Sequence, residues 1–377
     1  MRVTCLQENL SRGLSVVGRA VATRPTLPIT SHVLLSTEGS RLKLSATNLE
    51  LSISCWIDAQ VEEEGAATVP ARLFTELVGS LPNEPVEMNL AATGRALEVK
   101  CSRNEAHIGG MDVADFPPIP SLAEGVETKL DPAVLRHAIA RVVFAAASDE
   151  SRPVLTGVYT ELEGDQLTMA AADGFRLSVH TLPLMEAVSE KANVLIPSRA
   201  MSELSRLLGD QEEPLEVTIS SNRSQAHFRL KNAYMVSQLM QGTFPNYSQL
   251  IPKTHTTKVV VELSELLRAI RTASIFARDG SGIVRIEVAP GENGGPGQMI
   301  ISARAEEIGD HVGQVEALVE GEPTKIAFNN RYLVEVLSVL DCKQVALEAS
   351  TASSPGVIRP TDSEDYTHVV MPMFVQW

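Results

Sequence analysis

Arginine is the residue type whose placement along this chain could do chemistry. A similar amphipathic segment occurs three times, as "VPARLFTELVGSLP", "IPSRAMSELSRLLG" and "FNNRYLVEVLSVL". Each copy has an arginine near its start, and Arg72, Arg199 and Arg331 are separated by 127 and then 132 residues. A guanidinium group donates a planar fork of hydrogen bonds that suits phosphate and carboxylate oxygens. The spacing therefore predicts a triplicated fold that presents cations at equivalent places.

The residue patterns of common catalytic sites are not found. The sequence has no Gly-Lys dipeptide, hence no phosphate-binding loop of the GxxxxGK type, and no GxSxG segment. Its 8 histidines show no HxH, HxxxH or HExxH spacing. Acidic groups at 149–150 and 362–365 could ligate a metal, but their flanking serines favour solvated loops, and Asp173 before Gly174 favours an Asx turn. We therefore predict no enzyme, no metal site and no cofactor.

The elements that would position these arginines also repeat. Before each segment lies a pair of apolar residues four apart, typical of one helix face: Leu10 and Leu14, Leu135 and Ile139, and Leu266 and Ile270. An alternating strand pattern recurs as "RLKLSATN", "QLTMAAAD" and "QMIISARA". These patterns predict three homologous domains, at about 1–123, 124–253 and 254–377. Each is expected to be α+β, with antiparallel sheets and with helices gathered on one face.

Charge is distributed unevenly between the predicted helices and the rest of the chain. The net charge of −15 argues by itself against nucleic acid, since phosphates repel an acidic chain. The first helical segments (9–24, 133–147 and 266–278) nevertheless contain eight arginines and no acidic residue. With the second helices, the six segments have 12 basic and 3 acidic residues and leave 20 basic and 44 acidic residues elsewhere.

This segregation predicts a helical face that holds phosphates without reading their sequence. Aromatic residues do not interleave with these arginines, so base stacking is not predicted there. A solvated row of arginines that binds nothing would give the same count, and that alternative stays open.

Cysteine usage and the N-terminal segment predict a reducing compartment. Cys5, Cys55, Cys101 and Cys342 are scattered and form no CxxC pair. The start "MRVTCLQENL" has no apolar stretch of a secretory signal, and no apolar run approaches the roughly 20 residues that span a bilayer. We expect a cytoplasmic protein that has no membrane partner.

Six short motifs, taken in order, resemble a known family. They are "RPTLPI" (24–29), "TVPAR" (68–72), "ADFP" (114–117), "ADGFRL" (172–177), "FPNY" (244–247) and "HVVMPM" (368–373). On the three-repeat frame they make the chain similar to the bacterial DNA polymerase III beta subunit, the replicative sliding clamp, along essentially its whole length.

The resemblance implies three DNA-clamp domains per chain and a head-to-tail homodimer that closes into a six-domain ring. Helices would line the hole, and antiparallel sheets would form the outer wall. Such a ring would be a DNA-binding processivity factor for DNA replication, not an enzyme. It would encircle double-stranded DNA and tether the replicative DNA polymerase catalytic subunit and other clamp-binding-motif proteins. A separate clamp loader complex would open it.

The resemblance also implies functional residues. Arg24 matches a DNA-contacting position, and the lining is matched more loosely by Arg72, Arg136, Arg141, Arg199, Arg268 and Arg271. A hydrophobic cleft for partner peptides would comprise Leu155, Ala172, Gly174, Phe175, Arg176, Leu177, Pro245, Tyr332, Val369, Met371, Pro372 and Met373. The dimer interface would include Ile108, Ile275 and Phe276.

The chain departs from the family pattern in the cleft. Ala172 and Phe175 stand where the family often has Thr and His, and Gln249 stands where it often has a basic residue. The chain also continues past "MPM" as "FVQW", ending at Trp377. These changes leave the peptide preference and the role of the tail open, and they could mark a second clamp copy.

Two rival hypotheses remain at this stage. The first is an enzyme on triplicated α+β domains, such as a metal hydrolase, which would need converging histidines or carboxylates from two repeats. The second is an interaction scaffold of triplicated domains that never touches DNA. It predicts that neutralising Arg24, Arg136 and Arg268 together leaves DNA retention unchanged.

Overall fold

The structure, a computed structural model, describes residues 1–91, 96–121, 124–278, 281–291, 296–305 and 309–376. Trp377, the end of the predicted tail, lies outside them. The chain divides into two compact units. Unit 1 comprises Met1–Arg136, Leu184–Ala192 and Glu203–Met240, and unit 2 comprises His137–Pro183, Asn193–Ser202 and Gln241–Trp377.

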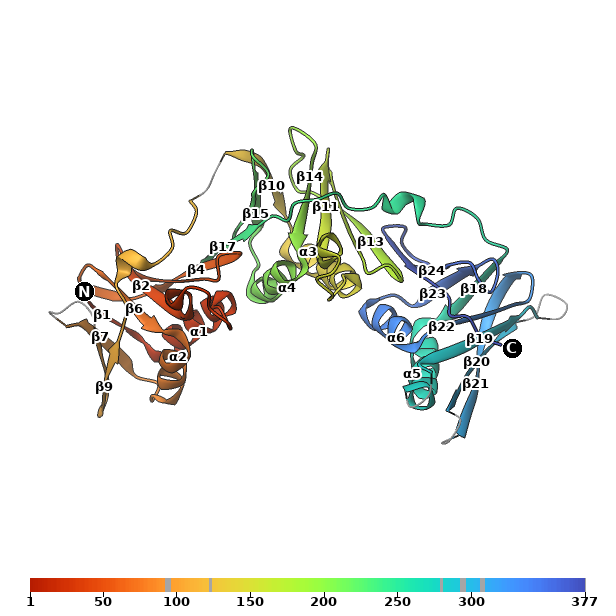
Figure 1. Cartoon of the computed structure of the whole chain (residues 1–377), viewed down its shortest axis with the longest axis horizontal. Helices are drawn as coiled ribbons and strands as arrows, with labels where there is room; N and C mark the ends of the chain where they lie inside the picture. The colour runs from red at the N-terminus through yellow and green to blue at the C-terminus, as the bar shows by residue number, and fades with distance from the viewer. Residues whose placement is uncertain (92–95, 122–123, 279–280, 292–295, 306–308, 377) are drawn as a thin grey trace. The chain divides into compact units, whose positions relative to one another are not determined.

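Short α-helices alternate with groups of strands along the chain (Figure 1). The α-helices are α1 (Gln7–Val17), α2 (Ala71–Ser80), α3 (Pro132–Val142), α4 (Ser198–Leu207), α5 (Leu263–Arg278) and α6 (Asn330–Val339). The 3-10 helices are η1 (Gly18–Ala20), η2 (Pro28–Ser31), η3 (Val113–Asp115), η4 (Val143–Ala145), η5 (Pro153–Thr156), η6 (Leu208–Asp210) and η7 (Tyr247–Gln249). No helix among the described residues has the length and apolar character needed to cross a membrane.

Unit 1 has two antiparallel sheets within the described residues. The five-stranded sheet has the order β5 (Gln60–Glu63), β1 (Arg2–Leu6), β7 (Pro85–Leu90), β8 (Ala96–Cys101) and β9 (Asn104–Gly109). The eight-stranded sheet has the order β10 (Gly125–Leu130), β15 (Leu215–Ser220), β16 (Gln225–Arg229), β17 (Ala233–Gln238), β4 (Leu51–Asp58), β3 (Arg41–Thr47), β2 (His32–Glu38) and β6 (Ala66–Pro70).

Unit 2 has one twelve-stranded sheet within the described residues. All residues of this sheet belong to unit 2 except Ala192, the first residue of β14, which is grouped with unit 1. Its order is β14 (Ala192–Pro197), β11 (Gly157–Glu163), β12 (Gln166–Ala172), β13 (Arg176–Pro183), β25 (Tyr366–Val370), β24 (Gly356–Pro360), β23 (Gln344–Ala349), β18 (Thr257–Glu262), β21 (Gly309–Gly321), β20 (Gly297–Ala305), β19 (Ile283–Ala289) and β22 (Thr324–Asn329).

Each of these wide sheets joins strands from two of the predicted repeats. In unit 1, β17 pairs antiparallel with β4, and Tyr234 lies opposite Ser54. In unit 2, β13 pairs antiparallel with β25, and Leu177 lies opposite Val369. Backbone hydrogen bonds, rather than side-chain contacts alone, therefore connect neighbouring repeats within each unit.

The apolar face of α1 packs on the sheet of unit 1. Leu10, Leu14 and Val17 follow helical spacing and are buried. Gly13 lets the helix approach closely, because a Cβ there would lie 3.2 Å from Leu44 Cδ1 and 3.4 Å from Cys55 Sγ. Full burial of one such leucine stabilises the fold by about 1.5–3 kcal/mol.

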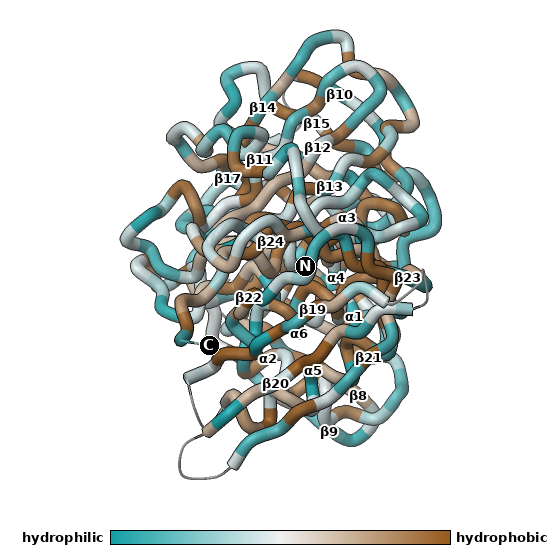
Figure 2. Tube along the Cα trace, turned by 90° about the vertical axis from the view of Figure 1, so that its right-hand side faces the viewer, coloured by the Kyte–Doolittle hydropathy of each residue, from teal (hydrophilic) through white to brown (hydrophobic). Residues whose placement is uncertain are grey.

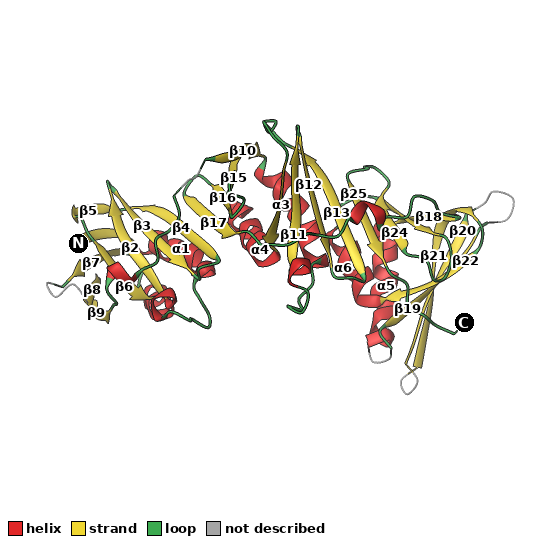
Figure 3. Cartoon of the chain, turned by 45° about the horizontal axis from the view of Figure 1, so that its top comes forward, coloured by secondary structure: helices red, strands yellow, loops and turns green. Residues whose placement is uncertain are grey.

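Unit 2 uses the same arrangement around α5 and α6. Ile270 and Ala273 of α5 are fully buried and share a core with Val336 of α6 and with Met299 and Ile301 of β20. Figure 3 shows α5 and α6 beside the strands of this unit, as α1 lies beside those of unit 1. Hydrophilic and hydrophobic residues alternate repeatedly along the tube in Figure 2, as expected where strands bury one face.

The helix bounds correct the predicted charge count. The first and fifth α-helices begin earlier than predicted and include Glu8 and Glu265, whereas α1 ends at Val17 and leaves Arg19 and Arg24 outside. The six α-helices contain ten arginines and five glutamates. The helices are therefore positive overall in an acidic chain, but less so than predicted.

Candidate functional site

Five of the predicted DNA-binding arginines are exposed and have no ion pair among the residues that the structure describes. They are Arg24, Arg136, Arg199, Arg268 and Arg271. Arg271 donates a hydrogen bond to Ser338 Oγ at 3.1 Å, which leaves its positive charge uncompensated. Arg12 of α1, which the sequence placed in the basic row, is exposed in the same way. Such side chains can exchange water for phosphate oxygens without first breaking an ion pair.

Two arginines of the second helices, Arg72 of α2 and Arg331 of α6, are instead paired with a glutamate one turn away. Arg72 Nε lies 2.9 Å from Glu76 Oε1, and Arg331 Nε lies 2.7 Å from Glu335 Oε1. The Arg72 side chain is 93% exposed, so solvent screens this pair and it would yield readily to a phosphate.

Arg141, which is also predicted to contact DNA, differs from these arginines in being buried. Its guanidinium carbon lies 5.8 Å from the ring centroid of Tyr366. Its charge stabilises the interior of unit 2 through the face of that ring. A phosphate in solvent could not reach it without local rearrangement.

Arg176 is the most extensively bonded residue of the predicted peptide cleft. Its Nε donates to Asp173 Oδ2 at 3.1 Å, its Nη2 donates to the Phe144 carbonyl at 2.7 Å, and its Nη1 donates to Glu335. The guanidinium lies 4.4 Å from the ring centroid of Tyr332. With its side chain 5% exposed, Arg176 joins β13 to α6 from inside and offers little surface to a ligand.

The electrostatics of this cluster follow from burial and from the two arginines. Burial raises the pKa of Glu335, but hydrogen bonds from Arg331 and Arg176 outweigh it and hold that pKa below its usual value. Asp173 also accepts hydrogen bonds from the backbone of Phe175 and Arg176, at 2.8 and 3.0 Å. This confirms the predicted Asx turn at Asp173.

The strand beneath the cluster contains neutral buried groups. His368 Nδ1 lies 2.8 Å from Ser178 Oγ, and burial lowers the pKa of His368 to about 3. Burial likewise raises the pKa of Tyr366. Both side chains therefore stay uncharged at neutral pH and act as packing and hydrogen-bonding groups.

The other predicted cleft residues divide into exposed and buried sets within unit 2. Gly174, Phe175, Pro245 and Met371 are exposed. Leu155, Tyr332, Pro372 and Met373 are partly buried, whereas Ala172, Leu177 and Val369 are buried. The backbone brings part of the set together, because the Met371 N–H donates to the Phe175 carbonyl at 2.8 Å. The neighbouring Phe175 and Met371 side chains, 57% and 43% exposed, supply apolar surface.

The C-terminal tail continues from this surface along another strand. The Met373 N–H donates to the Ala327 carbonyl at 2.7 Å, and Arg285 Nη2 donates to the Gln376 carbonyl at 3.4 Å. Phe374 is 89% exposed. The described part of the tail is thus held by its backbone, while its aromatic side chain faces solvent.

The three predicted dimer-contact residues differ in exposure. Ile275 on α5 is 58% exposed, and Phe276 is partly buried, with its ring centroid 5.9 Å from that of His311. Ile108 in β9 is only 3% exposed, because alternation along this strand turns it toward its own core. The prediction that the Ile108 side chain contacts a second chain is therefore not supported.

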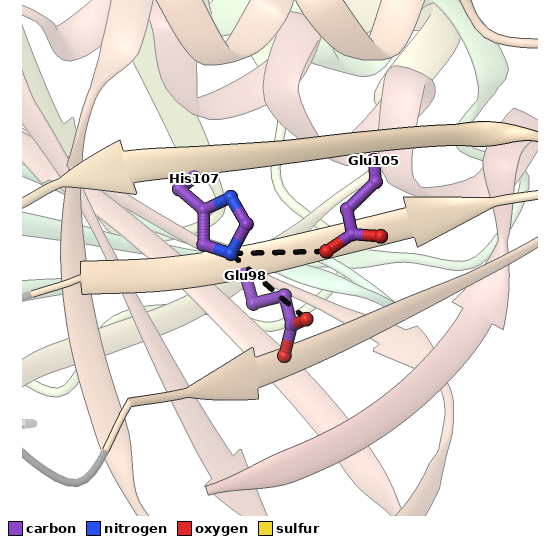
Figure 4. Close-up of side chains that lie close together, drawn as sticks. All are labelled: Glu98, Glu105 and His107. Carbon is purple, nitrogen blue, oxygen red and sulfur yellow. Dashed lines mark ion pairs between the residues drawn. The ribbon is translucent and has the colours of Figure 1, made fainter.

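One group of potential metal ligands was missed by the sequence analysis. Glu98, Glu105 and His107 lie together on β8 and β9, with His107 Nε2 3.8 Å from Glu105 Oε1 and 4.0 Å from Glu98 Oε1 (Figure 4). The alternation of polar residues in this hairpin was the available signal. Lys100 Nζ already lies 2.6 Å from Glu98 Oε1, so the group acts as a surface ion-pair network.

Solved structures define the class of protein to which this fold belongs. The DNA polymerase sliding clamp of Bacillus subtilis superposes with a TM-score of 0.94 at 28% identity, covering 100% of both chains. The DNA polymerase III beta subunit of Thermotoga maritima superposes with a TM-score of 0.90 at 27% identity, again covering 100% of both chains. The fold is that of a DNA polymerase sliding clamp.

Sequence comparisons identify the family. Models of the N-terminal, central and C-terminal domains of the DNA polymerase III beta subunit match residues 1–120, 129–246 and 248–374. The beta sliding clamps of Synechococcus elongatus and Synechocystis sp. are 31% and 32% identical over 376 and 393 residues, covering 99% of each chain. The chain belongs to the DNA polymerase III beta subunit family. This confirms the family, the three-clamp-domain α+β fold and the main functional reading, a DNA sliding clamp.

Proposed function

We propose that two copies of this chain close head to tail into a ring that encircles duplex DNA and slides along it. The observation that carries the proposal is a set of exposed arginines on α1, α3, α4 and α5, together with Arg24, that have no ion pair with any residue the structure describes. Contacts of this kind hold the phosphate backbone without selecting a sequence, so neighbouring positions along DNA have equal energy. The ring then stays on DNA because it is closed around the duplex, not because it binds the duplex tightly.

The exposed part of the cleft set is the proposed docking surface for partner peptides. Phe175 and Met371 supply apolar area, and methionine adapts its side chain to different partners. A sliding clamp of Pseudomonas aeruginosa has been solved bound to griselimycin, which shows ligand binding by a relative. We propose the replicative polymerase and other proteins with clamp-binding motifs as partners, and a clamp loader complex that opens the ring.

Tethering also accounts for a function without catalysis. A polymerase held on the ring has a high effective concentration at the primer end, so the clamp raises processivity with no active site of its own. We infer a non-enzymatic, cytoplasmic replication factor that needs no cofactor.

Electron microscopy with light scattering tests the ring. The expected result is a closed annulus with twice the 40.7 kDa mass of the chain. Retention on DNA tests encirclement: clamps placed by their loader on a nicked circular plasmid should stay bound and should leave when the plasmid is cut. Compact particles without a hole, or equal retention on linear DNA, would contradict the proposal.

Binding to a short duplex tests the arginines separately. The triple variant Arg24→Ala, Arg136→Ala, Arg268→Ala should bind more weakly than the wild type. Its log–log salt slope should be smaller by about 2.7, since each lost phosphate contact removes about 0.9. The control Arg103→Ala, Arg304→Ala removes exposed charges outside the helices and should leave the slope unchanged.

A further inference from the structure

A pocket of about 420 Å³ lies on the eight-stranded sheet of unit 1. Four cations line it: Arg41 and Lys43 of β3, Arg229 at the end of β16, and Lys231 in the turn that follows. No carboxylate is among the side chains that line this pocket. Its volume suits a nucleotide-sized group and excludes a duplex.

Strand register places the cations on two opposite banks. Lys43 of β3 lies opposite Trp56 of β4, and Arg229 of β16 lies opposite Tyr234 of β17. The order β3–β4–β17–β16 puts three inter-strand spacings, roughly 14 Å, between the backbones of the two banks. Long basic side chains can converge across this distance.

The Lys43 side of the pocket lies on the sheet face opposite α1. Side chains alternate between the two faces of a strand, so Lys43 and Trp56 point opposite to Leu44 and Cys55. The latter two lie against Gly13 of α1. Lys43 is therefore on the other face of the sheet from α1, whereas Arg41, Trp56 and Lys231 also line a neighbouring pocket that includes Arg12 of that helix.

The charges of the pocket are only loosely neutralised. Lys43 Nζ lies 3.6 Å from Glu38 Oε1, Arg229 Nε lies 3.7 Å from Glu216 Oε2, and Lys231 pairs with Glu213. These three carboxylates are about half exposed, so solvent screens each pair. Arg41 has no ion pair among the described residues. An incoming anion would therefore compete only with solvent-screened carboxylates for these cations.

Aromatic rings lie between the two banks. Trp56 and Tyr234 line the pocket and are partly exposed, and Lys43 Nζ lies 5.0 Å from the centroid of the Trp56 ring. Cations that alternate with aromatic surfaces match the phosphates and bases of a single strand. The carboxylates of an acidic peptide could pair with the cations, but such a peptide has no ring to stack on the aromatic side chains.

We propose that this pocket binds a segment of single-stranded nucleic acid, with phosphates on the Arg41–Lys43 and Arg229–Lys231 banks and a base against the aromatic floor. Ring formation and encirclement are not required for this site. The proposal therefore extends beyond the sliding-clamp function and can fail independently of it.

Tryptophan fluorescence gives a local test. The chain has 2 tryptophans, so the variant Trp377→Phe leaves Trp56 as the sole reporter. Titration of this full-length protein with a short oligothymidylate should change Trp56 fluorescence. With about four phosphate contacts, the salt slope is about −2.8, so a fourfold rise in salt should weaken binding about 50-fold.

Variants of the two banks test the charges. Arg41→Ala, Lys43→Ala should reduce that salt effect to about sevenfold, since two contacts remain. Arg229→Ala, Lys231→Ala should do the same without altering the cations that lie over Trp56. Arg103→Ala, in the turn after β8, is the matched control and should bind like the parent. Thermal unfolding of each variant checks that it is folded.

Three results would overturn the proposal. The first is oligothymidylate that leaves Trp56 fluorescence unchanged, and the second is equal affinity in folded variants of both banks. The third is a polyglutamate peptide that binds as tightly as the oligonucleotide, which would reassign the pocket to acidic protein segments.

Discussion

Replacing Arg176 tests whether a buried ion-pair cluster holds β13 to α6. Arg176→Ala removes hydrogen bonds to Asp173, Glu335 and the Phe144 carbonyl and leaves two carboxylates that are 14% and 27% exposed. Loss of one partner from a buried pair destabilises a protein by about 3–5 kcal/mol. Arg331 still pairs with Glu335 at 2.7 Å, so we expect the lower end, about 3 kcal/mol.

Urea unfolding followed by circular dichroism measures this loss. With a slope near 3 kcal/mol per molar, the midpoint for unit 2 should fall by about 1 M. Arg176→Lys keeps a charge but loses the planar fork, and Arg176→Met keeps apolar contact with Tyr332 but loses the charge. Both variants should be destabilised, Arg176→Lys less than Arg176→Ala.

The pH dependence gives a second readout with a definite sign. The pKa of Glu335 is lowered in the folded protein, so its ion pairs contribute stability above the usual pKa of 4.5. That contribution is lost as the pH falls from this value through the lower folded pKa. The stability difference between wild type and Arg176→Ala should therefore narrow under acidic conditions.

Two outcomes would refute this reasoning. If Arg176→Ala and Arg176→Met unfold at the wild-type urea concentration, the cluster does not stabilise the unit. If the stability difference instead widens on acidification, Glu335 is not the group that Arg176 stabilises.

Three further substitutions probe local packing, each measured by thermal unfolding. Gly174→Ala should destabilise by about 1–2 kcal/mol, because Gly174 has φ +92° and a Cβ would lie 2.6 Å from Arg152 Nη1; wild-type stability would mean that the loop relaxes freely. Phe74→Ala should lose about 3–5 kcal/mol, since Phe74 is fully buried, and a loss below 1 kcal/mol would contradict its place in the core. Arg72→Ala should leave the unfolding temperature at the wild-type value despite the ion pair of Arg72 with Glu76, and a clear drop would show that this exposed pair is structural.

Helical periodicity explains why two of the predicted DNA-binding arginines differ in exposure. Arg136 and Arg141 are five positions apart, which turns them about 140° from each other on an α-helix. They therefore cannot share one face, and the structure exposes Arg136 while burying Arg141. Counting basic residues per helix placed both arginines on the same surface. Their five-residue spacing, which the sequence gives, already implied that they lie on different sides of the helix.

Helix boundaries were less predictable than helix existence. The apolar pattern locates α1 and α5, but their first turns also include Glu8 and Glu265. Acidic side chains are stabilised near the positive end of a helix, so they belong there although they weaken the predicted charge contrast. The apolar spacing that identified the helices does not report such first-turn residues.

Contacts between repeats were beyond the reach of the sequence patterns. Alternation identifies β4 and β17 as strands but does not say which strands pair. The partners of Arg176 show the same limit, because Glu335 is 159 positions away. Family resemblance placed Arg176 at a peptide surface, and only the structure revealed its internal bonds.

The pairing of β4 with β17 and of β13 with β25 separates the unit of duplication from the unit of folding. Three segments match family domains, yet the chain forms two compact units. A repeat excised from its neighbour would expose a row of unsatisfied backbone amides, which invites aggregation. Recombination among relatives must therefore preserve the backbone pairing between these strands, whereas their side chains can diverge.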